Sequence, residues 1–302
     1  MDTAIRHHFN KDILNYEQLT GGYTFETWLL TLSGNEKVVF RHQRDLTIGN
    51  DKEIIISEIL EREKFFYENI NKTVGKVCPE VYIIDGTRKF HENSFCIMEY
   101  IEGIPLDKCF DDLDVKVKND TLYRIGELAA NINNMVIAKE HPYVKTRGVW
   151  EIFISNRLRD RFIPLIHRKV ITKDEADAIA EKMLKKSANK NLSFLHLDMR
   201  RVNMIYNKGD IFLLDAENCE FGDPLFELST IDCGGELDKT LIDGYIQAYN
   251  GSIDLDDDLY YFYKMERMAL VLHVFMNIVK SDIETQKYLK VFNELKHQLS
   301  RL

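Results

Sequence analysis

Hydrophobic and polar residues alternate through much of the first hundred residues, and later the apolar residues recur at helical spacing. Residues 16–43 alternate β-branched and aromatic residues with polar ones, and Gly-Gly and Ser-Gly-Asn interrupt the run. This pattern predicts three strands joined by turns. Residues 52–70 place apolar side chains at helical spacing among many glutamates, which predicts a helix. Two more strand-like segments follow, at 77–84 and 94–101.

The second part of the chain is predicted to be mostly helical. Helical spacing covers residues 120–138, 150–168, 173–189, 236–249 and 256–280. A strand-rich segment at 193–215 interrupts these helices. Strands first and helices later indicate an α+β protein in two lobes. We place the boundary near residue 102, so residues 1–101 form the N-terminal lobe and residues 102–302 form the C-terminal lobe.

Charge and cysteine content narrow the class of function. The 302 residues include 40 Lys and Arg against 49 Asp and Glu, which gives a net charge of −9. Phosphate backbones and anionic lipids are bound by basic surfaces, so we expect neither nucleic acid nor a membrane as a partner. The 5 cysteines are widely spaced and include no C-x-x-C pair. With no signal-peptide pattern and no apolar run of membrane-spanning length, we expect a cytoplasmic protein with reduced thiols.

Three residues of the strand-rich segment have a spacing that suits phosphoryl transfer. Asp198 and Asn203 share one loop, and two short apolar strands joined by a tight turn then lead to Asp215. A hairpin of this length returns Asp215 to the neighbourhood of Asn203. Magnesium usually takes one or two protein carboxylates, so Asn203 and Asp215 suit a Mg²⁺ site. Asp198 then suits the base for an attacking hydroxyl, with His196 orienting the loop; the alternative is a surface loop rich in Asp and Asn.

The same segment resembles the catalytic region of the aminoglycoside phosphotransferase and choline kinase family. The HLD run at 196–198 and the asparagine at 203 resemble the family's catalytic loop, and the LDAE run at 214–217 resembles its metal-binding segment. The GDP run at 222–224 resembles a signature whose aspartate is structural. The resemblance extends in order over roughly residues 16 to 280 and implies a bilobal, protein-kinase-like fold with an antiparallel N-terminal sheet. The implied residues are Asp198 as base, Asn203 and Asp215 as Mg²⁺ ligands, and His196, Glu217 and Asp223 in support.

The N-terminal lobe resembles the nucleotide-binding side of the family. The LTGGYT run at 19–24 resembles the phosphate-covering loop, in which Gly21 and Gly22 would let the backbone approach phosphate oxygens. Arg41 stands where relatives often have a lysine that contacts the nucleotide phosphates, and Glu63 resembles the helix glutamate that pairs with this cation. Glu53, Glu58 and Glu61 on the same predicted helix are the alternatives for this pairing. From the residues alone, the glycines could form an ordinary hairpin turn and the arginine could lie on an exposed edge.

The FCIMEYIEG run at 95–103 resembles the hinge between the lobes. The resemblance implies that backbone groups of Glu99 and Ile101 contact the base of the nucleotide. It leaves the choice between ATP and GTP open. The catalytic loop departs from the family at Leu197, where many relatives have glycine, and it carries additional positive charge at Arg200 and Arg201. Either arginine could steady a phosphate or simply be exposed.

The acceptor of the phosphoryl group is the part on which the sequence is least informative. In the family the acceptor lies in the helical lobe, where carboxylates would suit a cationic acceptor such as an amino sugar or a quaternary amine. The acidic candidate contacts are Asp232, Glu236, Asp238 and Glu266, and Arg200 of the catalytic loop is a further candidate. Arginines at 157, 159 and 161 are a countersignal, because they could hold an anionic acceptor such as a sugar phosphate. They could equally form a solvated face.

We therefore expect an enzyme that moves the γ-phosphoryl group of ATP or GTP to a hydroxyl of a small molecule with the aid of Mg²⁺. An aminoglycoside-type antibiotic is the simplest acceptor, which would imply a role in antibiotic resistance; choline, ethanolamine or another metabolite is the alternative. A nucleotide-binding pseudokinase is the alternative of another class, against which the retained Asp198, Asn203 and Asp215 argue. A protein kinase is disfavoured, because the GDP run follows Asp215 within about eight residues and no Ala-Pro-Glu follows. The sequence does not decide between a monomer and a homodimer.

Overall fold

The computed structural model describes residues 1–19, 25–43 and 56–301, and its chain forms two compact units. The first comprises Met1–Asp112 and Arg201–Cys219, and the second comprises Leu113–Arg200 and Glu220–Leu302. This division differs from a single boundary near residue 102, because a later hairpin returns to the first unit. Its Leu213 N–H donates to the Val77 carbonyl at 2.7 Å.

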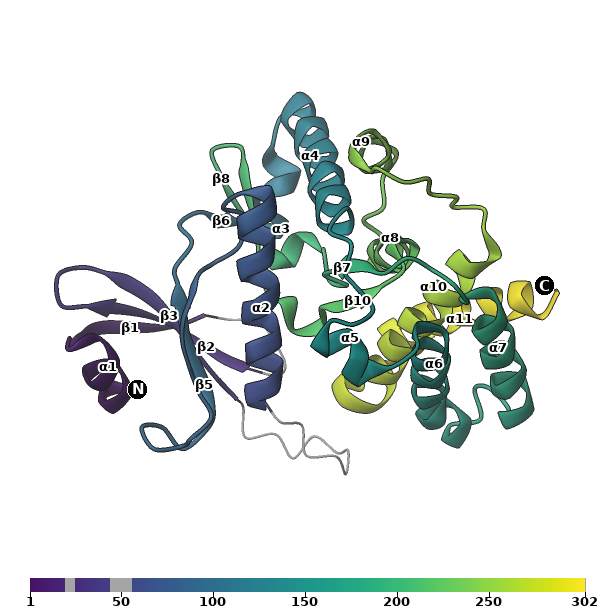
Figure 1. Ribbon diagram of the computed structural model, residues 1–302, viewed down its shortest axis with the longest axis horizontal. Coiled ribbons are helices and arrows are strands. Elements are labelled where there is room, and N and C mark those ends of the chain that lie inside the picture. The colour runs from purple at the N-terminus through teal and green to yellow at the C-terminus, as the bar shows by residue number, and fades with distance from the viewer. Residues whose placement is uncertain (20–24, 44–55, 302) are drawn as a thin grey trace. The chain divides into compact units, whose positions relative to one another are not determined.

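Among the described residues, the first unit contains a five-stranded antiparallel sheet in the order β1-β2-β3-β5-β4 (Figure 1). The three consecutive strands predicted within residues 16–43 are β1, β2 and β3, and the two later strand-like segments are β4 and β5. The strands are β1 (Ile13–Leu19), β2 (Phe25–Leu32), β3 (Lys37–Gln43), β4 (Val81–Asp85) and β5 (Phe95–Glu99).

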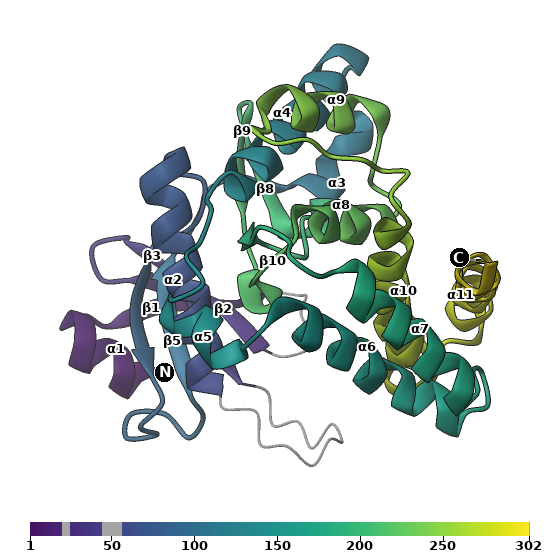
Figure 2. The ribbon, with the colours of Figure 1, turned by 45° about the vertical axis from the view of Figure 1, so that its right-hand side comes forward.

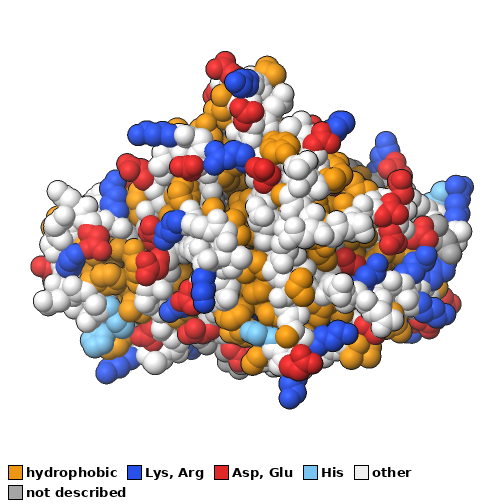
Figure 3. Space-filling model, turned by 45° about the horizontal axis from the view of Figure 1, so that its top comes forward, with side chains coloured by type: hydrophobic (Ala, Val, Ile, Leu, Met, Phe, Trp, Pro, Cys, Tyr) orange, Lys and Arg blue, Asp and Glu red, His pale blue; other side chains and the backbone are white. Residues whose placement is uncertain are grey.

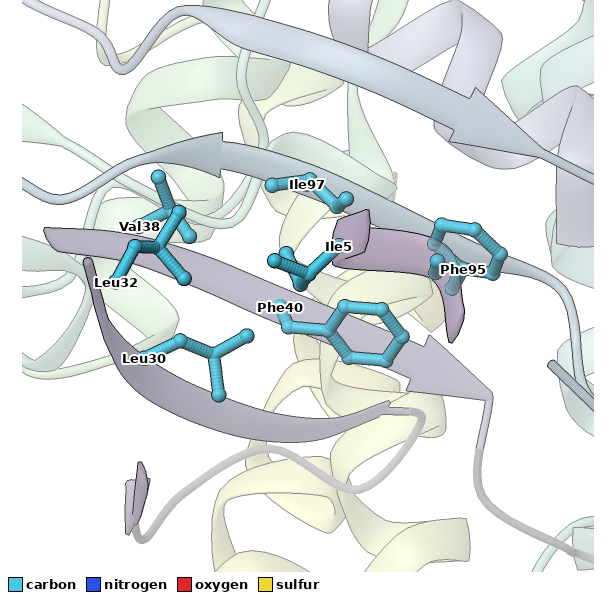
Figure 4. Packing of buried hydrophobic residues seen from close by; sticks show 8 residues of the cluster. Ile5, Leu30, Leu32, Val38, Phe40, Phe95 and Ile97 are labelled. Carbon is cyan, nitrogen blue, oxygen red and sulfur yellow. The ribbon is translucent and has the colours of Figure 1, made fainter. Parts of the chain in front are cut away.

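One face of this sheet packs on α1 (Asp2–Phe9), and α2 (Ile56–Val74) lies on the opposite face (Figure 1). Figure 4 shows the buried cluster beneath α1, which includes Ile5, Leu30, Leu32, Val38, Phe40, Phe95 and Ile97. Because side chains alternate along a strand, Val38 and Phe40 enter this cluster while Arg41 points to the face that carries α2. The sheet therefore separates a hydrophobic core from the side on which Arg41 lies.

The first unit also contains the short elements that follow β5 and the returning hairpin. They are β6 (Ile104–Pro105), α3 (Leu106–Cys109), the 3₁₀ helices η1 (Phe110–Asp112), η2 (Arg201–Asn203) and η3 (Ala216–Asn218), and the strands β8 (Met204–Asn207) and β9 (Asp210–Leu213). Strand β8 pairs with β6 on one side and β9 on the other. Lys208 and Gly209 form the tight turn of the hairpin, and both have positive φ angles, of 51° and 101°. Such angles suit a two-residue hairpin loop.

The second unit is mostly helical. Its helices are α4 (Val115–Asn133), α5 (Pro142–Arg147), α6 (Trp150–His167), α7 (Lys173–Lys186), α8 (Pro224–Cys233), α9 (Lys239–Ala248), α10 (Asp258–His273), the π-helix η4 (Val274–Val279) and α11 (Asp282–Arg301). The strands β7 (Ser193–Leu195) and β10 (Glu220–Gly222) pair with each other. Figure 2 shows α6 beside α7 and α10 running between α6 and α8. Asp223, Asp238 and Asp257 cap the starts of α8, α9 and α10 through their side chains.

The predicted helices are present with shifted ends, and α1, α3, α5, α8 and α11 lie outside the predicted ranges. Helix α4 begins and ends about five residues earlier than the predicted 120–138. It ends at Asn133, where the side chains of two successive asparagines bind carbonyl groups that are distant in the sequence. The Asn133 amide donates to the Phe194 carbonyl at 2.7 Å, and the Asn134 amide donates to the Ala248 carbonyl at 2.9 Å. Helix α11 buries Phe292, Leu295 and Leu299 along one stripe.

The surface carries both signs of charge. On the face shown in Figure 3, acidic and basic side chains lie interspersed. Within the described part of the chain, no helix is both long and apolar enough to cross a membrane. All five cysteines lie in this part, and they are free thiols.

Helices α4 and α9 approach each other closely at two glycines (Figures 1 and 2). A Cβ atom at Gly126 would lie 2.0 Å from the Leu241 carbonyl oxygen, and one at Gly244 would lie 2.2 Å from the Tyr123 carbonyl oxygen. Neither position has room for a side chain, because both obstructing atoms belong to the backbone. The glycines thus set the distance between the two helices.

We predict that Gly126→Ala lowers the free energy of unfolding by about 2 kcal/mol, because overpacking at a backbone contact forces the helices apart. By helix propensity alone, alanine would stabilise the helix by about 1 kcal/mol relative to glycine. A loss of stability therefore indicates overpacking. Urea unfolding of the wild type and the variant measures it. A gain in stability would show that the helices do not approach this closely.

Candidate active site

The β8–β9 hairpin brings Asn203 and Asp215 to its open end. Met204 pairs with Leu213, and the Leu214 N–H donates to the Asn203 carbonyl at 2.8 Å. Asp215 is the next residue, so the hairpin returns it beside Asn203 as the spacing predicts. Its backbone is left-handed, with φ of 61°, which is uncommon for a residue other than glycine.

Arg41 of β3 and Glu63 of α2 form a buried ion pair in the first unit. The Arg41 Nη1 donates to both Glu63 carboxylate oxygens, at 2.9 and 3.1 Å. The side chains are 9% and 1% exposed. The Arg41 guanidinium also lies 4.5 Å from the Phe25 ring centre. The structure thus joins the two residues that the sequence pairs, and it places the arginine in the interior instead of on an exposed edge.

This ion pair continues into the segment that follows β9. The Tyr67 hydroxyl donates to Glu63 Oε1 at 2.8 Å. The Ala216 N–H lies 3.2 Å from both Glu63 Oε1 and the Tyr67 hydroxyl oxygen. Arg41 Nη2 reaches Asp215 Oδ1 at 3.5 Å. The network therefore links β3, α2 and the Asp215 segment through charged and hydrogen-bonded groups.

The ion pair keeps Arg41 positively charged although it is buried. Burial is the largest influence and lowers the pKa of Arg41, but Glu63 and further groups, Asp215 among them, raise the pKa well above its ordinary value. An arginine that stays charged in this position can bind phosphate oxygens. Arg62 precedes Glu63 on α2, and its Nη2 donates to the Glu217 carbonyl at 3.1 Å. Glu217 therefore makes this contact through its backbone and not through its carboxylate.

The loop after β7 in the second unit is held by Glu227 of α8. The His196 and Leu197 N–H groups donate to the two Glu227 oxygens at 2.5 and 2.9 Å. Leu197 has φ of 60°, a left-handed conformation that costs a non-glycine residue about 1–2 kcal/mol. Glycine adopts this conformation without that cost. The Asp198 N–H donates to His196 Nδ1 at 3.3 Å, so the histidine orients the loop.

Two arginines bind the Asp198 carboxylate. Arg200 donates from Nε to Oδ1 at 2.6 Å and from Nη2 to Oδ2 at 2.9 Å. Arg267 of α10 donates from Nη2 to Oδ1 at 2.9 Å. Burial raises the pKa of Asp198, but the hydrogen bond from Arg200 and the charges of Arg267 and Arg200 outweigh it, so the pKa lies below its ordinary value. Asp198 is therefore held as a carboxylate.

Asp223 is a structural residue of the second unit. Its Oδ1 caps α8 by accepting from the Leu225 N–H at 3.0 Å, and its Oδ2 accepts from the Tyr263 hydroxyl at 3.2 Å. The Lys190 ammonium group lies 3.8 Å from the same oxygen. Burial raises the pKa of Asp223. These contacts join the start of α8 to α10.

Asn203 and Asp215 offer the donor set that Mg²⁺ prefers. An amide oxygen and a carboxylate are hard oxygen ligands, and Mg²⁺ takes few protein ligands when phosphates complete its shell. Among the described residues, no three His, Cys, Asp or Glu side chains cluster as a metal site. Asn203 and Asp215 both lie in the first unit, at the open end of the β8–β9 hairpin. The residues present thus suit a nucleotide-bound Mg²⁺.

The remaining nucleotide-side predictions concern Gly21, Gly22, Glu99 and Ile101. Gly21 and Gly22 lie outside the described residues. The Glu99 N–H donates at 2.8 Å to the carbonyl of Glu80, which precedes β4, and the Glu99 carboxylate pairs with Lys76 at 2.5 Å. Contacts between the base and the backbone at Glu99 and Ile101 stay a prediction.

The acidic residues proposed to hold a cationic acceptor are already paired. Glu266 is fully buried, and Arg157 and Arg161 donate to its Oε1 at 2.7 and 3.2 Å. Asp232 accepts from the Tyr260 hydroxyl at 2.6 Å and pairs with Lys264 at 2.6 Å. Glu266 therefore has no surface on which to meet an acceptor, and Asp232 has its charge neutralised. These contacts correct the expectation of an open acidic site at these two residues; Glu236 stays an untested candidate.

Three residues that position the site were not among the candidates, namely Tyr67, Glu227 and Arg267. Glu227 lies three residues after the GDP run, so its nearness in the sequence was a usable signal. Arg267 is 69 residues from the Asp198 that it binds. No local pattern marks such a partner.

The sequence profile described as "APH: Phosphotransferase enzyme family" matches residues 15–262. The chain belongs to this phosphotransferase family. A comparison with curated protein sequences gave no match. The profile supports the family assignment, and solved structures support the fold.

Solved structures show that this phosphotransferase has a protein-kinase-like fold. A proposed aminoglycoside phosphotransferase from Ralstonia eutropha JMP134 has 15% identity and a TM-score of 0.68, with 99% of this chain and 95% of that chain covered. A proposed fructosamine-3-kinase from Thermobifida fusca YX-ER1 has 11% identity and a TM-score of 0.70, with coverage of 100% and 99%. An APH(2″) enzyme in complex with GDP and kanamycin has 14% identity and a TM-score of 0.64, with 97% of each chain covered.

We predict that Glu63→Gln lowers the free energy of unfolding of the phosphotransferase by about 3–5 kcal/mol, because it leaves the buried Arg41 without its counter-charge. Glu68→Gln is the matched control on the same helix. Its side chain is 62% exposed beside Lys64, and we expect a change within about 0.5 kcal/mol. Urea unfolding measures both variants. Equal stabilities would show that the Arg41 pair is dispensable for folding.

We predict a pH-dependent stability that originates at Glu227. Burial raises the pKa of Glu227 to about 7 from 4.5, against the hydrogen bonds from His196 and Leu197. A raised carboxyl pKa stabilises the fold fully below pH 4.5, and this contribution is lost as the pH rises through about 7. The slope reaches about 1.4 kcal/mol per pH unit.

Glu227→Gln removes this titration, so the stability difference between the wild type and the variant should change across that window and level off outside it. The pKa values of Asp198 and Glu266 lie below their ordinary values, so their contributions are lost only at more acidic pH. Urea unfolding across the pH range measures the difference. A constant difference would contradict the buried, protonated state of Glu227.

Proposed function

We propose that the protein transfers the γ-phosphoryl group of ATP or GTP to a hydroxyl of a small molecule. The observation that carries this proposal is the buried network in which Arg41, fixed by Glu63, reaches the Asp215 segment. In this proposal residues 1–101 form the nucleotide-binding lobe, and residues 102–302 form the catalytic and acceptor-binding lobe. Among the structural neighbours, one was solved with GDP and kanamycin and another with ADP, which supports a nucleotide co-substrate.

On the nucleotide side, Arg41 binds phosphate oxygens, and Glu63 keeps its guanidinium charged and oriented. Asn203 and Asp215 would hold Mg²⁺, which when bound neutralises negative charge on the phosphates. In this proposal the backbone at Glu99 and Ile101 contacts the base. Glu217 supports this side through its carbonyl, which accepts from Arg62.

Asp198 accepts the proton of the acceptor hydroxyl. The acceptor oxygen forms a bond to the γ-phosphorus while the bond to the bridging oxygen breaks, and the electron pair of that bond leaves with the nucleoside diphosphate. A carboxylate with a low pKa suits this reaction, because the transition state is loose and needs positioning more than a strong base. His196 and Asp223 hold the second unit's loop and helix in place.

The acceptor class is the finer part of the proposal. The sequence favours an aminoglycoside-type acceptor, and one of the similar solved structures is a complex with kanamycin. The charge around Asp198 does not favour a polycation, because Arg200 and Arg267 adjoin it and Glu266 is already neutralised. We therefore propose a small-molecule hydroxyl without assigning it to an amino sugar. A role in antibiotic resistance would follow only from an aminoglycoside acceptor.

The test is Mg²⁺-dependent ADP or GDP release with ATP and GTP over a panel of amino-sugar antibiotics, choline, ethanolamine and simple sugars. We predict that Asp198→Asn lowers turnover by about a hundredfold to ten-thousandfold, because the hydroxyl proton loses its acceptor, while nucleotide binding is retained. Asp243→Asn, at an exposed position on α9, is the matched control and should keep full turnover.

Calorimetry with the nucleotide and Mg²⁺ supplies the second readout. Asp215→Ala should abolish the Mg²⁺-dependent part of nucleotide binding, and unchanged binding would contradict its role as a ligand. Unchanged turnover in Asp198→Asn would remove the assignment of the base. Nucleotide binding without any turnover that depends on Asp198 would favour a pseudokinase.

A further inference from the structure

Arg200 of the catalytic loop and Arg267 of α10 both bind the Asp198 carboxylate, but they come from different parts of the second unit. Arg200 lies two residues after Asp198 on the same loop, and its side chain is 42% exposed. The Arg267 side chain is 10% exposed and belongs to a helix that lies 69 residues further along the chain. A movement of the loop would carry Arg200 with it. Arg267, in contrast, ties the loop to a separate element.

Helix α10 runs between α6 and α8 (Figure 2) and is fixed by buried contacts. Glu266, the residue before Arg267, is fully buried and accepts from Arg157 of α6 at 2.7 Å. One turn earlier, Tyr263 is buried and its hydroxyl donates to Asp223 at 3.2 Å. Successive helix residues point about 100° apart around the axis, so a rotation of α10 that displaced Arg267 would also break the contact of Glu266. Arg267 therefore projects from a helix whose rotation is fixed.

Stability alone does not explain a charged pair at this place. The Asp198 side chain is 5% exposed, and desolvation of a buried pair offsets much of the attraction between its charges. The pair does fix the carboxylate, because Arg267 Nη2 donates to Asp198 Oδ1 at 2.9 Å. A base must be ionised and must lie within hydrogen-bond distance of the proton that it accepts. The contact with Arg267 meets both needs.

We propose that Arg267 is a positioning residue for phosphoryl transfer, which holds the Asp198 carboxylate in the orientation that accepts the proton of the acceptor hydroxyl. This inference rests on the proposed function with Asp198 as its base. Arg267 acts through Asp198 and not on the nucleotide. Its loss should therefore lower kcat and leave nucleotide binding unchanged.

The first test measures Mg²⁺-dependent ADP release with an acceptor that the panel identifies. Arg267→Met removes the guanidinium group and keeps a long side chain in the same space. We expect kcat to fall by about tenfold to a hundredfold, because a displacement of about 1 Å at a catalytic group has an effect of this size. KM for the nucleotide should not change. Arg267→Lys keeps the positive charge and should recover part of the lost kcat.

Lys264→Met is the matched control, because it removes another cation from α10. Lys264 lies three residues before Arg267, its side chain is 20% exposed, and it pairs with Asp232 at 2.6 Å. We expect this variant to keep full turnover, and urea unfolding shows that each variant is folded. The same loss of kcat in Lys264→Met would indicate a general disturbance of α10 and would overturn the inference.

The decisive measurement repeats Arg267→Met in the Asp198→Asn background. A residue that acts through the carboxylate has little left to position once the carboxylate is gone, so the two effects should not add. Arg267→Met should then reduce the residual turnover far less than it reduces that of the wild type. The full reduction in this background as well would show that Arg267 acts independently of the base, which contradicts the inference.

Arg267→Lys replaces Arg267→Met in each comparison if the methionine variant does not fold, and wild-type kcat in the folded variant overturns the inference. If the panel contains no acceptor that is turned over, crystal structures of the wild type and the folded variant decide. We expect the Asp198 carboxylate to lie in a different orientation in the variant, and the same orientation in both would refute the positioning role. The kinase proposal fails separately, by ADP release that is the same in Asp198→Asn as in the wild type.

Discussion

The buried ion pair between Arg41 and Glu63 is the constraint on which the first unit depends. A guanidinium enclosed by protein needs a counter-charge, and the counter-charge comes from a helix on the opposite side of the sheet from the hydrophobic cluster. Glu63 also accepts from the backbone of Ala216, so the same carboxylate holds the strand, the helix and the segment carrying Asp215. Displacement of any one of these elements would leave a buried charge exposed to apolar surroundings. The contacts that stabilise the unit thus also orient Arg41, its candidate phosphate-binding cation.

The second unit positions its candidate base in a comparable way. There, a buried carboxylate accepts hydrogen bonds from the backbone at a strained residue. Leu197 adopts a left-handed conformation immediately before Asp198, and Glu227 accepts from the two N–H groups at this point. Asp215 in the first unit is left-handed as well, and the adjacent Ala216 N–H is bonded to Glu63. In both places a buried glutamate binds the backbone next to a strained residue. Strain that the surrounding structure fixes in this way is typical of functional sites.

The sequence allowed prediction of the features that depend on local spacing. The alternation in residues 16–43, the two-residue turn at Lys208 and Gly209 and the return of Asp215 to Asn203 are all set by residues close in the chain. Helix ends were predicted less well, because α4 ends where Asn133 and Asn134 bond to distant carbonyls. Helix α11 was not predicted although its apolar stripe is regular, and the grouping of the hairpin with the first unit depends on a bond to Val77.

The region predicted to bind the acceptor shows that residue types alone do not reveal which charged side chains are paired in the folded chain. Acidic residues after the GDP run, together with Glu266 on a later predicted helix, suggested a site for a cation. In the folded chain Arg157 and Arg161 bind Glu266, and Arg200 and Arg267 bind Asp198, so both carboxylates are paired with cations of the same unit. Charge acts over a few ångströms once groups are partly buried, and distant surface carboxylates are screened by solvent. The charge state of this region is therefore set by which side chains pack together, and the arginines of α6 and α10 are paired with Glu266 and Asp198.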